Sequence, residues 1–339
     1  MPGPLLDAYG KPLRRPVVYL DTSTLGNAYP GAQDADPMLT EVVALAASRG
    51  TLCLSIAHVI ELAAIPVRDY ALGIGRWLDS LDRAWVQVTS AEDAELTHAL
   101  RAQVGLTADP ARLPVHHTIT AALRDNFDTL TPPGTVEILR DPTVAGFISS
   151  THGKIEWQQA REFSVRAFKM LHFDRAGLPS ETSREQVRST TTAKFVNSLR
   201  RKARAILSSE PTVIGSSPRG DADADAAIDR LLGDPLSLPI NRIAPHCWRA
   251  VGDRILDQSS ESKKFVDRYG SFMWDTRHAV SGAFADVFTC DRFVNEILGD
   301  FRTDRGLQRQ LSVGRDVDRV AFAAALRQQI EAVDEGARS

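Results

Sequence analysis

The chain has 339 residues, a formal net charge of -3, 43% hydrophobic residues and 24% charged residues. These values exclude a uniformly basic nucleic-acid coating protein, an acidic tail protein and a chain that is disordered throughout. No apolar run approaches the ~18 residues that a membrane span needs. The cysteines Cys53, Cys247 and Cys290 lack the spacing of a disulfide framework or a zinc site. We therefore expect a cytoplasmic protein with no membrane contact.

Strands and helices alternate in the first part of the chain. The apolar run 17–20 and the segment 51–55 predict buried strands, and the alternation over 84–90 predicts a third. The segment 22–37 is rich in Gly, Pro, Asn and Asp, which favours a turn and loop. Helices are predicted at 38–49, 56–65 and 69–82. This alternation is typical of an α/β fold with a parallel sheet.

The strand pattern fades after about residue 95 and returns near residue 265. The stretch between is mostly helical in pattern, with breaks at 132–134 and 215–225. The later elements are predicted as a helix at 275–285, a strand at 286–290, a helix at 292–299 and a C-terminal helix near 316–332. We predict a sheet flanked by helices, interrupted by a helical, locally basic insertion, with parts at 16–95, 96–264 and 265–339.

Four acidic residues stand at the ends of these elements. Asp21 ends the first strand, and Glu61 lies in the apolar helix after the second. Asp275 starts the helix before the last clear strand, and Asp291 ends that strand. In a parallel sheet these positions converge on one edge, where carboxylates would repel one another and raise their own pKa values. A divalent cation removes that cost, and a site made only of oxygens suits Mg²⁺ or Mn²⁺.

The segments that carry these acids resemble the motifs of PIN-domain nucleases. VVYLDTSTLGNAY is similar to the first motif, LSIAHVIELAAI to the second, and DTRHAVSGAFADVFTCDRF to the third and fourth. The resemblance covers roughly 16–95 and 265–315 and leaves the middle uncovered. It implies a PIN-like parallel sheet, cleavage of single strands, most often RNA, and a metal site made of Asp21, Glu61, Asp275 and Asp291. It also implies support or phosphate contact from the hydroxyl positions Thr22, Ser23 and Thr289.

Other residues near these acids have two interpretations each. Arg277 and Arg292 each lie close to an acid, and each is either a phosphate contact or a solvated arginine. His278, one turn from Asp275, is either a base or a packed supporting histidine, and we favour the second. Core packing is likewise favoured over base stacking for the tryptophans Trp157, Trp248 and Trp274.

The segment 151–210 is basic, with 12 Lys or Arg against 6 acids, a difference of +6. Its densest part, KFVNSLRRKAR at 194–204, is either a nucleic-acid-binding face or a solvated helix face. The candidate binding residues are Lys194, Arg200, Arg201, Lys202 and Arg204.

The leading hypothesis is a metal-dependent endoribonuclease, a toxin or defence effector, that hydrolyses phosphodiester bonds of an RNA substrate. Its insertion would select the RNA or bind an inhibitor or regulatory protein. The alternatives are a structure-specific DNA nuclease using the same site and an inert nucleic-acid-binding or protein-binding scaffold. A phosphatase with Asp21 as nucleophile is disfavoured, because the position two residues on is Ser23 rather than Asp. The oligomeric state stays open, a homodimer included.

Overall fold

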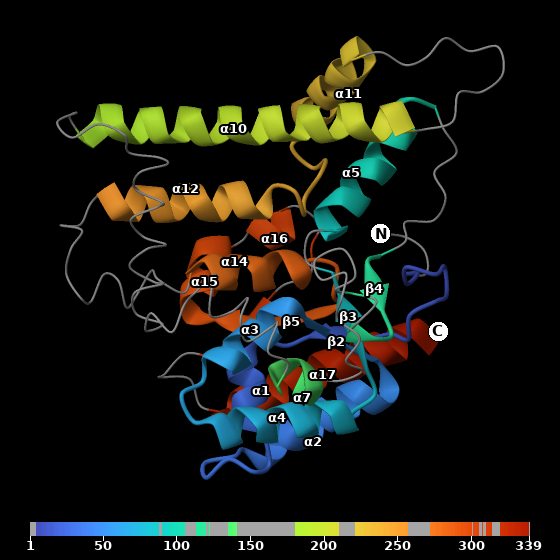
Figure 1. Cartoon of the computed structure of the whole chain (residues 1–339), viewed down its shortest axis with the longest axis vertical. Helices are drawn as coiled ribbons and strands as arrows, with labels where there is room; N and C mark the ends of the chain where they lie inside the picture. Colours follow the sequence, from blue (N-terminus) through green and yellow to red (C-terminus); the bar gives the residue numbers. More distant parts are fainter. Residues whose placement is uncertain are drawn as a thin grey trace.

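The computed structural model describes residues 5–87, 90–105, 113–119, 122, 135–140, 180–209, 221–256, 272–299, 301–304, 307, 310–313 and 319–338. Over these residues, a central sheet lies between two groups of helices, and a further helical layer covers one side (Figure 1). Within the same ranges, no helix combines the length and apolar content needed to cross a bilayer.

Among the described residues, the sheet has six strands in the order β4-β3-β2-β1-β5-β6. All neighbouring strands are parallel except β3 and β4, which are antiparallel. The strands are β1 (Val17–Tyr19), β2 (Thr51–Ser55), β3 (Arg83–Val86), β4 (Val115–His116), β5 (Val287–Asp291) and β6 (Gln310–Val313). The predicted α/β fold with a mostly parallel sheet flanked by helices is therefore confirmed. The direction of strand order reverses between β1 and β5, which is where open α/β sheets bind ligands.

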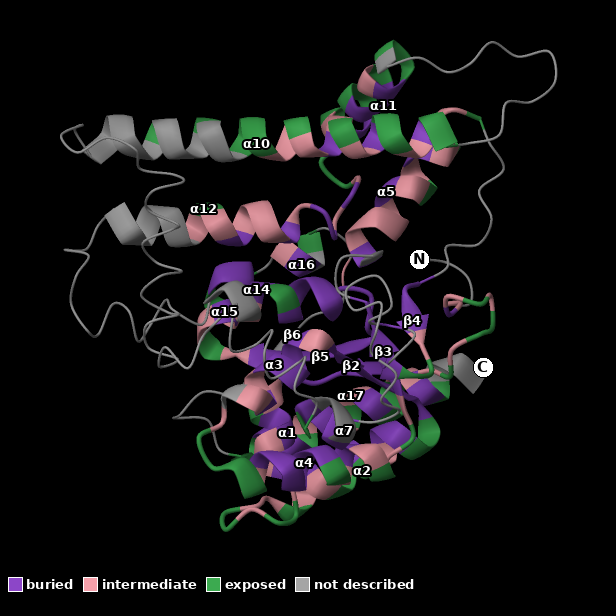
Figure 2. Ribbon diagram, viewed as in Figure 1, coloured by how far each residue is buried: buried purple, intermediate pink, exposed green. Residues whose placement is uncertain are grey.

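The central strands are buried over almost their whole length because helices cover both faces of the sheet. Val18 and Leu20 pack into a core on one face, while Val17 and Tyr19 pack into a core on the other. Figure 2 shows the strands as buried, between helices that expose their outer surfaces. Such continuous apolar runs are typical of parallel strands buried on both sides.

Helices close both faces of the sheet. The first core is covered by α1 (Thr22–Ala28), α2 (Pro37–Arg49), α3 (Ile56–Ala64), α4 (Arg68–Ser80), α7 (Thr135–Arg140) and α17 (Arg319–Arg338). The second is covered by α12 (Ile243–Leu256), α14 (Phe272–Ser281), α15 (Arg292–Leu298) and α16 (Phe301–Asp304). A third apolar cluster joins α5 (Ser90–Gln103), α10 (Ser180–Ser209) and α11 (Asp221–Gly233). In Figure 1, α10 runs beside α12 on the side away from the sheet.

Two segments expected as loops form helices. Residues 22–28 are α1, because Thr24, Leu25 and Ala28 share one face and are buried there. The break predicted at 215–225 ends earlier than expected, because α11 begins at Asp221, where acidic side chains suit the positive end of the helix dipole. Residues 215–220 lie outside the described residues.

Two strands were not predicted. β4 and β6 lie at the edges of the sheet and have only two and four residues, too short for a clear alternation pattern. β4 pairs with β3, and α7 packs on α4, so these parts of 96–264 lie with the sheet layer. The boundaries at 95 and 265, and the interruption itself, stay predictions.

The buried carboxylate of Asp286 joins the start of β5 to the start of β1. It accepts a hydrogen bond from the Val17 amide at 2.8 Å and forms an ion pair with Arg15. We expect Asp286→Ala to lower the free energy of unfolding by about 1–3 kcal/mol, because the buried amide loses its acceptor. Asp82→Ala is the control, since it breaks an exposed pair with Arg14 worth about 0–1 kcal/mol. Urea unfolding at pH 7 measures both, and equal losses would contradict the expectation.

Candidate functional site

The four predicted acids line one small pocket at the carboxyl ends of β1 and β5. Asp21 follows β1 and stands before α1, while Asp291 is the last residue of β5 and stands before α15. Glu61 comes from α3 and Asp275 from the first turn of α14. The pocket has a volume of about 100 Å³ and is lined by Asp21, Thr22, Ser23, Glu61, Asp275, His278, Cys290, Asp291 and Val294. We call it the acid pocket.

Hydroxyl groups hold the carboxylate of Asp21. Ser23 Oγ and Thr24 Oγ1 donate to its two oxygens, and Thr289 Oγ1 donates to Oδ1 at 2.8 Å. In return, the Asp21 amide donates to Thr289 Oγ1 at 2.9 Å. The carboxylate makes no cap hydrogen bond to α1, so its orientation is set by these hydroxyls rather than by the helix. Of these residues, Ser23 and Thr289 were predicted as supports.

Asp291 has a different environment from Asp21. Its Oδ1 accepts a hydrogen bond from the Val294 amide at 2.7 Å and so caps α15. Burial raises the pKa of Asp291, the Val294 amide opposes that rise, and the charges of Asp21 and Glu61 add to it. Burial is the largest cause of this raised pKa, and the charges of the neighbouring acids add the repulsion that the sequence predicts at this edge.

Glu61 is joined to a chain of buried polar groups. Its Oε2 lies 2.9 Å from His278 Nε2, and His278 Nδ1 lies 2.8 Å from the Tyr19 hydroxyl. The same hydroxyl lies 2.7 Å from Ser55 Oγ. Burial lowers the pKa of His278, but the charge and the hydrogen bond of Glu61 raise it by more than burial lowers it. The net shift is therefore upward. Burial raises the pKa of Glu61, while His278 and Thr22 lower it to a net decrease. These opposite shifts favour an imidazolium–carboxylate pair.

A second histidine fixes the start of α3 behind this pair. His58 Nδ1 accepts from the Ser55 amide at 2.9 Å, so its Nε2 carries the proton and donates to the Leu20 carbonyl at 2.6 Å. Its ring lies edge-on to that of His278, with centroids 4.7 Å apart. His58 therefore connects the end of β1 to the helix that carries Glu61. Sequence reasoning missed it, although a histidine three residues after a helix-capping serine is a recognisable capping arrangement.

Sequence reasoning also missed Thr24 and Tyr19. Thr24 is three residues after Asp21, the spacing at which a side chain in the first helical turn reaches back to the cap residue. Tyr19 lies two residues before Asp21 on β1. Its hydroxyl could be expected to need a buried partner, but nothing in the sequence names His278.

The predicted cationic residues lie outside the acid pocket. Arg292 is exposed and pairs with Glu296 one turn along α15, and Arg277 is exposed on α14. On α10, ion pairs engage three of the candidates, joining Arg200 to Asp229, Lys202 to Asp93 and Arg204 to Asp225. Lys194 and Arg201 are exposed on the same helix. The basic stretch is thus largely used to bind α11 and α5. A nucleic-acid role for its exposed members stays a prediction.

The acid pocket has the donor chemistry of a hard-metal site without the compact ligand geometry. Its acids offer oxygen atoms only, as Mg²⁺ and Mn²⁺ prefer. Within the described residues, however, no three acidic, histidine or cysteine side chains are grouped closely enough to hold an ion. Glu61 faces His278, and Asp291 faces the amide of α15. Ion binding therefore requires some of these carboxylates to turn.

Comparison with protein-family models, with curated proteins and with solved structures finds no match for this chain. The likeness to PIN-domain nucleases therefore rests on the sequence motifs.

The pKa of His58 predicts how stability depends on pH. Burial, and then the charge of His278, lower this pKa to about 4, against an ordinary value of 6.5. As the pH falls below 6.5, the unfolded chain takes up a proton that the folded protein refuses until about pH 4, so the protein loses stability. We expect His58 to contribute a loss of about 2 kcal/mol between pH 7 and pH 5.

The measurement is urea unfolding at pH 7 and pH 5 for the wild type, His58→Gln and the exposed-histidine control His98→Gln. His58→Gln should lose less stability over this interval than the other two proteins. His278 is present in all three proteins, so its own titration does not distinguish them. If the free energy of unfolding of His58→Gln fell between pH 7 and pH 5 by as much as that of the wild type, the expectation would be contradicted.

Proposed function

We propose that the protein is a metal-dependent nuclease that hydrolyses phosphodiester bonds at the acid pocket, with RNA as its substrate. One observation carries the proposal, namely that Asp21, Glu61, Asp275 and Asp291 come from four different elements and line a single pocket. The pocket lies where the strand order reverses, the usual position of a ligand in an open α/β sheet. RNA is proposed because the motifs that carry the acids resemble those of PIN-domain nucleases.

The same four carboxylates would hold Mg²⁺ or Mn²⁺. When bound, such an ion offsets the charge of a phosphodiester and lowers the pKa of a coordinated water well below its bulk value of about 15.7. A set of oxygen ligands suits either ion. After burial, the charges of Asp21 and Glu61 contribute to the raised pKa of Asp291, and a bound cation would offset that repulsion.

The surrounding residues have positioning roles in this proposal. Ser23, Thr24 and Thr289 hold the carboxylate of Asp21 in its orientation, because each donates a hydrogen bond to it. His278 holds Glu61 against the pocket wall and shares its proton with that carboxylate. The imidazole and the Tyr19 hydroxyl behind it are buried, so this side of the pocket excludes water.

Cleavage assays test the proposal directly. We expect the wild type to cleave single-stranded RNA with Mn²⁺ and to lose activity in EDTA. Asp21→Asn and Asp291→Asn should each lower the rate by about 100-fold or more, because each removes a charge that the ion requires. The exposed Asp69→Asn on α4 is the matched control and should keep wild-type activity. Cleavage that survives both pocket substitutions would refute the mechanism, and faster cleavage of DNA flaps would change the substrate to DNA.

Metal binding should also be visible without any substrate. In EDTA, we expect Asp291→Asn to be more stable than the wild type, because it removes one of the mutually repelling carboxylates. Adding Mn²⁺ should raise the melting temperature of the wild type. At a concentration of 100 times the dissociation constant, the ion should add about 2.7 kcal/mol to the free energy of unfolding. It should raise that of Asp291→Asn less, while Asp69→Asn responds like the wild type. Equal responses in all three proteins, or none, would favour an inert scaffold.

A further inference from the structure

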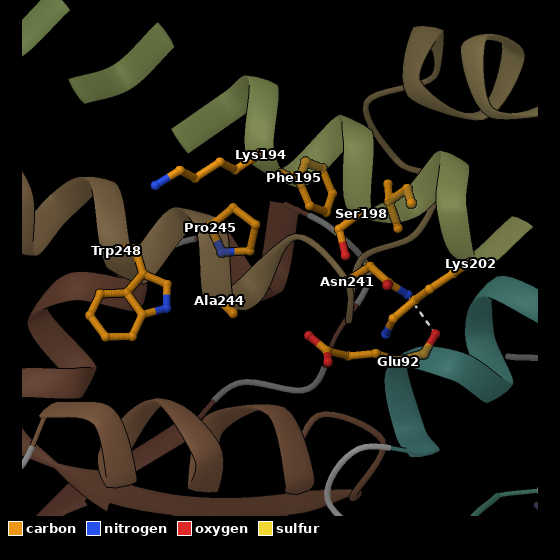
Figure 3. Close-up of a pocket in the computed structure, with 10 residues that line it drawn as sticks. Glu92, Lys194, Phe195, Ser198, Lys202, Asn241, Ala244, Pro245 and Trp248 are labelled. Carbon is orange, nitrogen blue, oxygen red and sulfur yellow. Dashed lines mark hydrogen bonds between the residues drawn. The ribbon is translucent and has the colours of Figure 1, made fainter. Parts of the chain in front are cut away.

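A second pocket lies between α5, α10 and α12, on the side of α12 away from the sheet (Figure 3). Its volume is about 310 Å³, within the range of roughly 300–1,000 Å³ that is usual for small-ligand sites. It is lined by Glu92, Lys194, Phe195, Ser198, Leu199, Lys202, Asn241, Ala244, Pro245 and Trp248. We call it the α10 pocket. It is three times the volume of the acid pocket, and it shares no residue with it.

Two aromatic rings reach the α10 pocket from opposite helices. Phe195 points from α10 toward α12, and Trp248 projects from α12 at one end of the cavity (Figure 3). Both are partly buried, so each keeps some exposed ring surface. Ala244 and Pro245 add apolar surface between the two rings. Aromatic rings in such positions bind nucleobases by stacking, with little preference for base identity.

The charged groups of the pocket favour an anion. Lys194 and Lys202 both line it from α10, against one lining carboxyl group, Glu92. Lys202 Nζ lies 2.6 Å from Asp93 Oδ1, so its charge is already partly balanced. Lys194 is exposed and stands at the rim beside the two aromatic residues. Among the residues that line the pocket, Lys194 is the cation that stands at the aromatic end.

The opposite end of the pocket is a fixed polar wall. Asn241 Nδ2 donates to the Glu92 carbonyl and to Glu95 Oε2, both at 2.8 Å, so its amide is held in place. Burial raises the pKa of the Glu92 carboxyl group, while the charges of Lys202 and Arg277 oppose the rise. This wall can exchange hydrogen bonds with the polar edge of a base.

Helix α14 connects the two pockets. Asp275 and His278 of α14 line the acid pocket, and the charge of Arg277 on the same helix acts on Glu92. α14 also packs against α12 and α5, two of the three helices that form the α10 pocket. A strand of nucleic acid with one nucleotide in the α10 pocket would therefore be held against the helix that supplies Asp275.

We propose that the α10 pocket binds one nucleotide of a single-stranded nucleic acid, with its base against Trp248 and Phe195 and its phosphate at Lys194. This inference rests on the proposed function, since it takes the substrate of the acid pocket to be a nucleic acid. RNA and DNA share the base and phosphate chemistry that the pocket recognises, so the experiment includes both.

The test measures binding rather than cleavage. Full-length protein carrying Asp21→Asn is titrated into short fluorescein-labelled single-stranded RNA, or DNA of the same sequence, in EDTA, and anisotropy gives Kd. We expect Trp248→Leu to raise Kd about five-fold or more through the loss of base stacking. Lys194→Ala should lower the slope of log K against log salt by about 0.7, the value for one phosphate contact on a single strand. Trp77→Leu on α4 and Lys11→Ala are the matched controls and should change neither quantity.

Each outcome supports or overturns the inference. Unchanged Kd and salt slope in both pocket variants would overturn it, as would a parent protein that binds neither RNA nor DNA. If Trp248→Leu fails to fold, Lys194→Ala decides, with Lys194→Arg expected to restore the salt slope. Cleavage by the wild type with unaltered binding in the pocket variants refutes the α10 pocket alone. Pocket-dependent binding without Mn²⁺-dependent cleavage refutes the proposed function alone.

Discussion

The fold depends on the pairing of β1 with β5, because these strands bring distant parts of the chain together. Val18 pairs with Val287 and Tyr19 with Phe288, between polar contacts at both ends. At the start, Asp286 accepts from the Val17 amide, and at the other end Thr289 exchanges hydrogen bonds with Asp21. The second of these contacts also forms a wall of the acid pocket, so strand register and site geometry are set by the same atoms.

Gathering four carboxylates at that edge is costly, and the surrounding residues offset the cost separately for each. Asp21 accepts hydrogen bonds from hydroxyl groups, and Glu61 pairs with a histidine. Asp291 accepts a hydrogen bond from a helix amide. The pKa of Asp291 is nevertheless raised, so its hydrogen bond to the helix amide offsets the cost only in part. A cation would offset the part of this shift that comes from the neighbouring charges, which is why a metal is proposed for the pocket.

The sequence was most informative where burial alone decides structure. The apolar runs of β1, β2 and β5 and the acids that follow them identify the sheet and its polar edge. Contacts that depend on tertiary arrangement were out of reach. The pair of Glu61 and His278 forms only when α3 and α14 meet, and the acids of α11 engage α10 only because both are helices. Local composition misplaced α1, because polar turn-forming residues hide its buried face.

The seam between β1 and β5 also has a consequence for synthesis on the ribosome. Asp21 and Glu61 leave the exit tunnel early, whereas Asp275 and Asp291 follow only after the helices of the outer layer. Until β5 emerges, the edge of β1 lacks its partner and Thr289 is missing from beside Asp21. A chain that stops just short of β5 therefore carries three of the four acids but lacks Asp291 and Thr289. The proposed metal binding would therefore be restricted to chains translated past that strand.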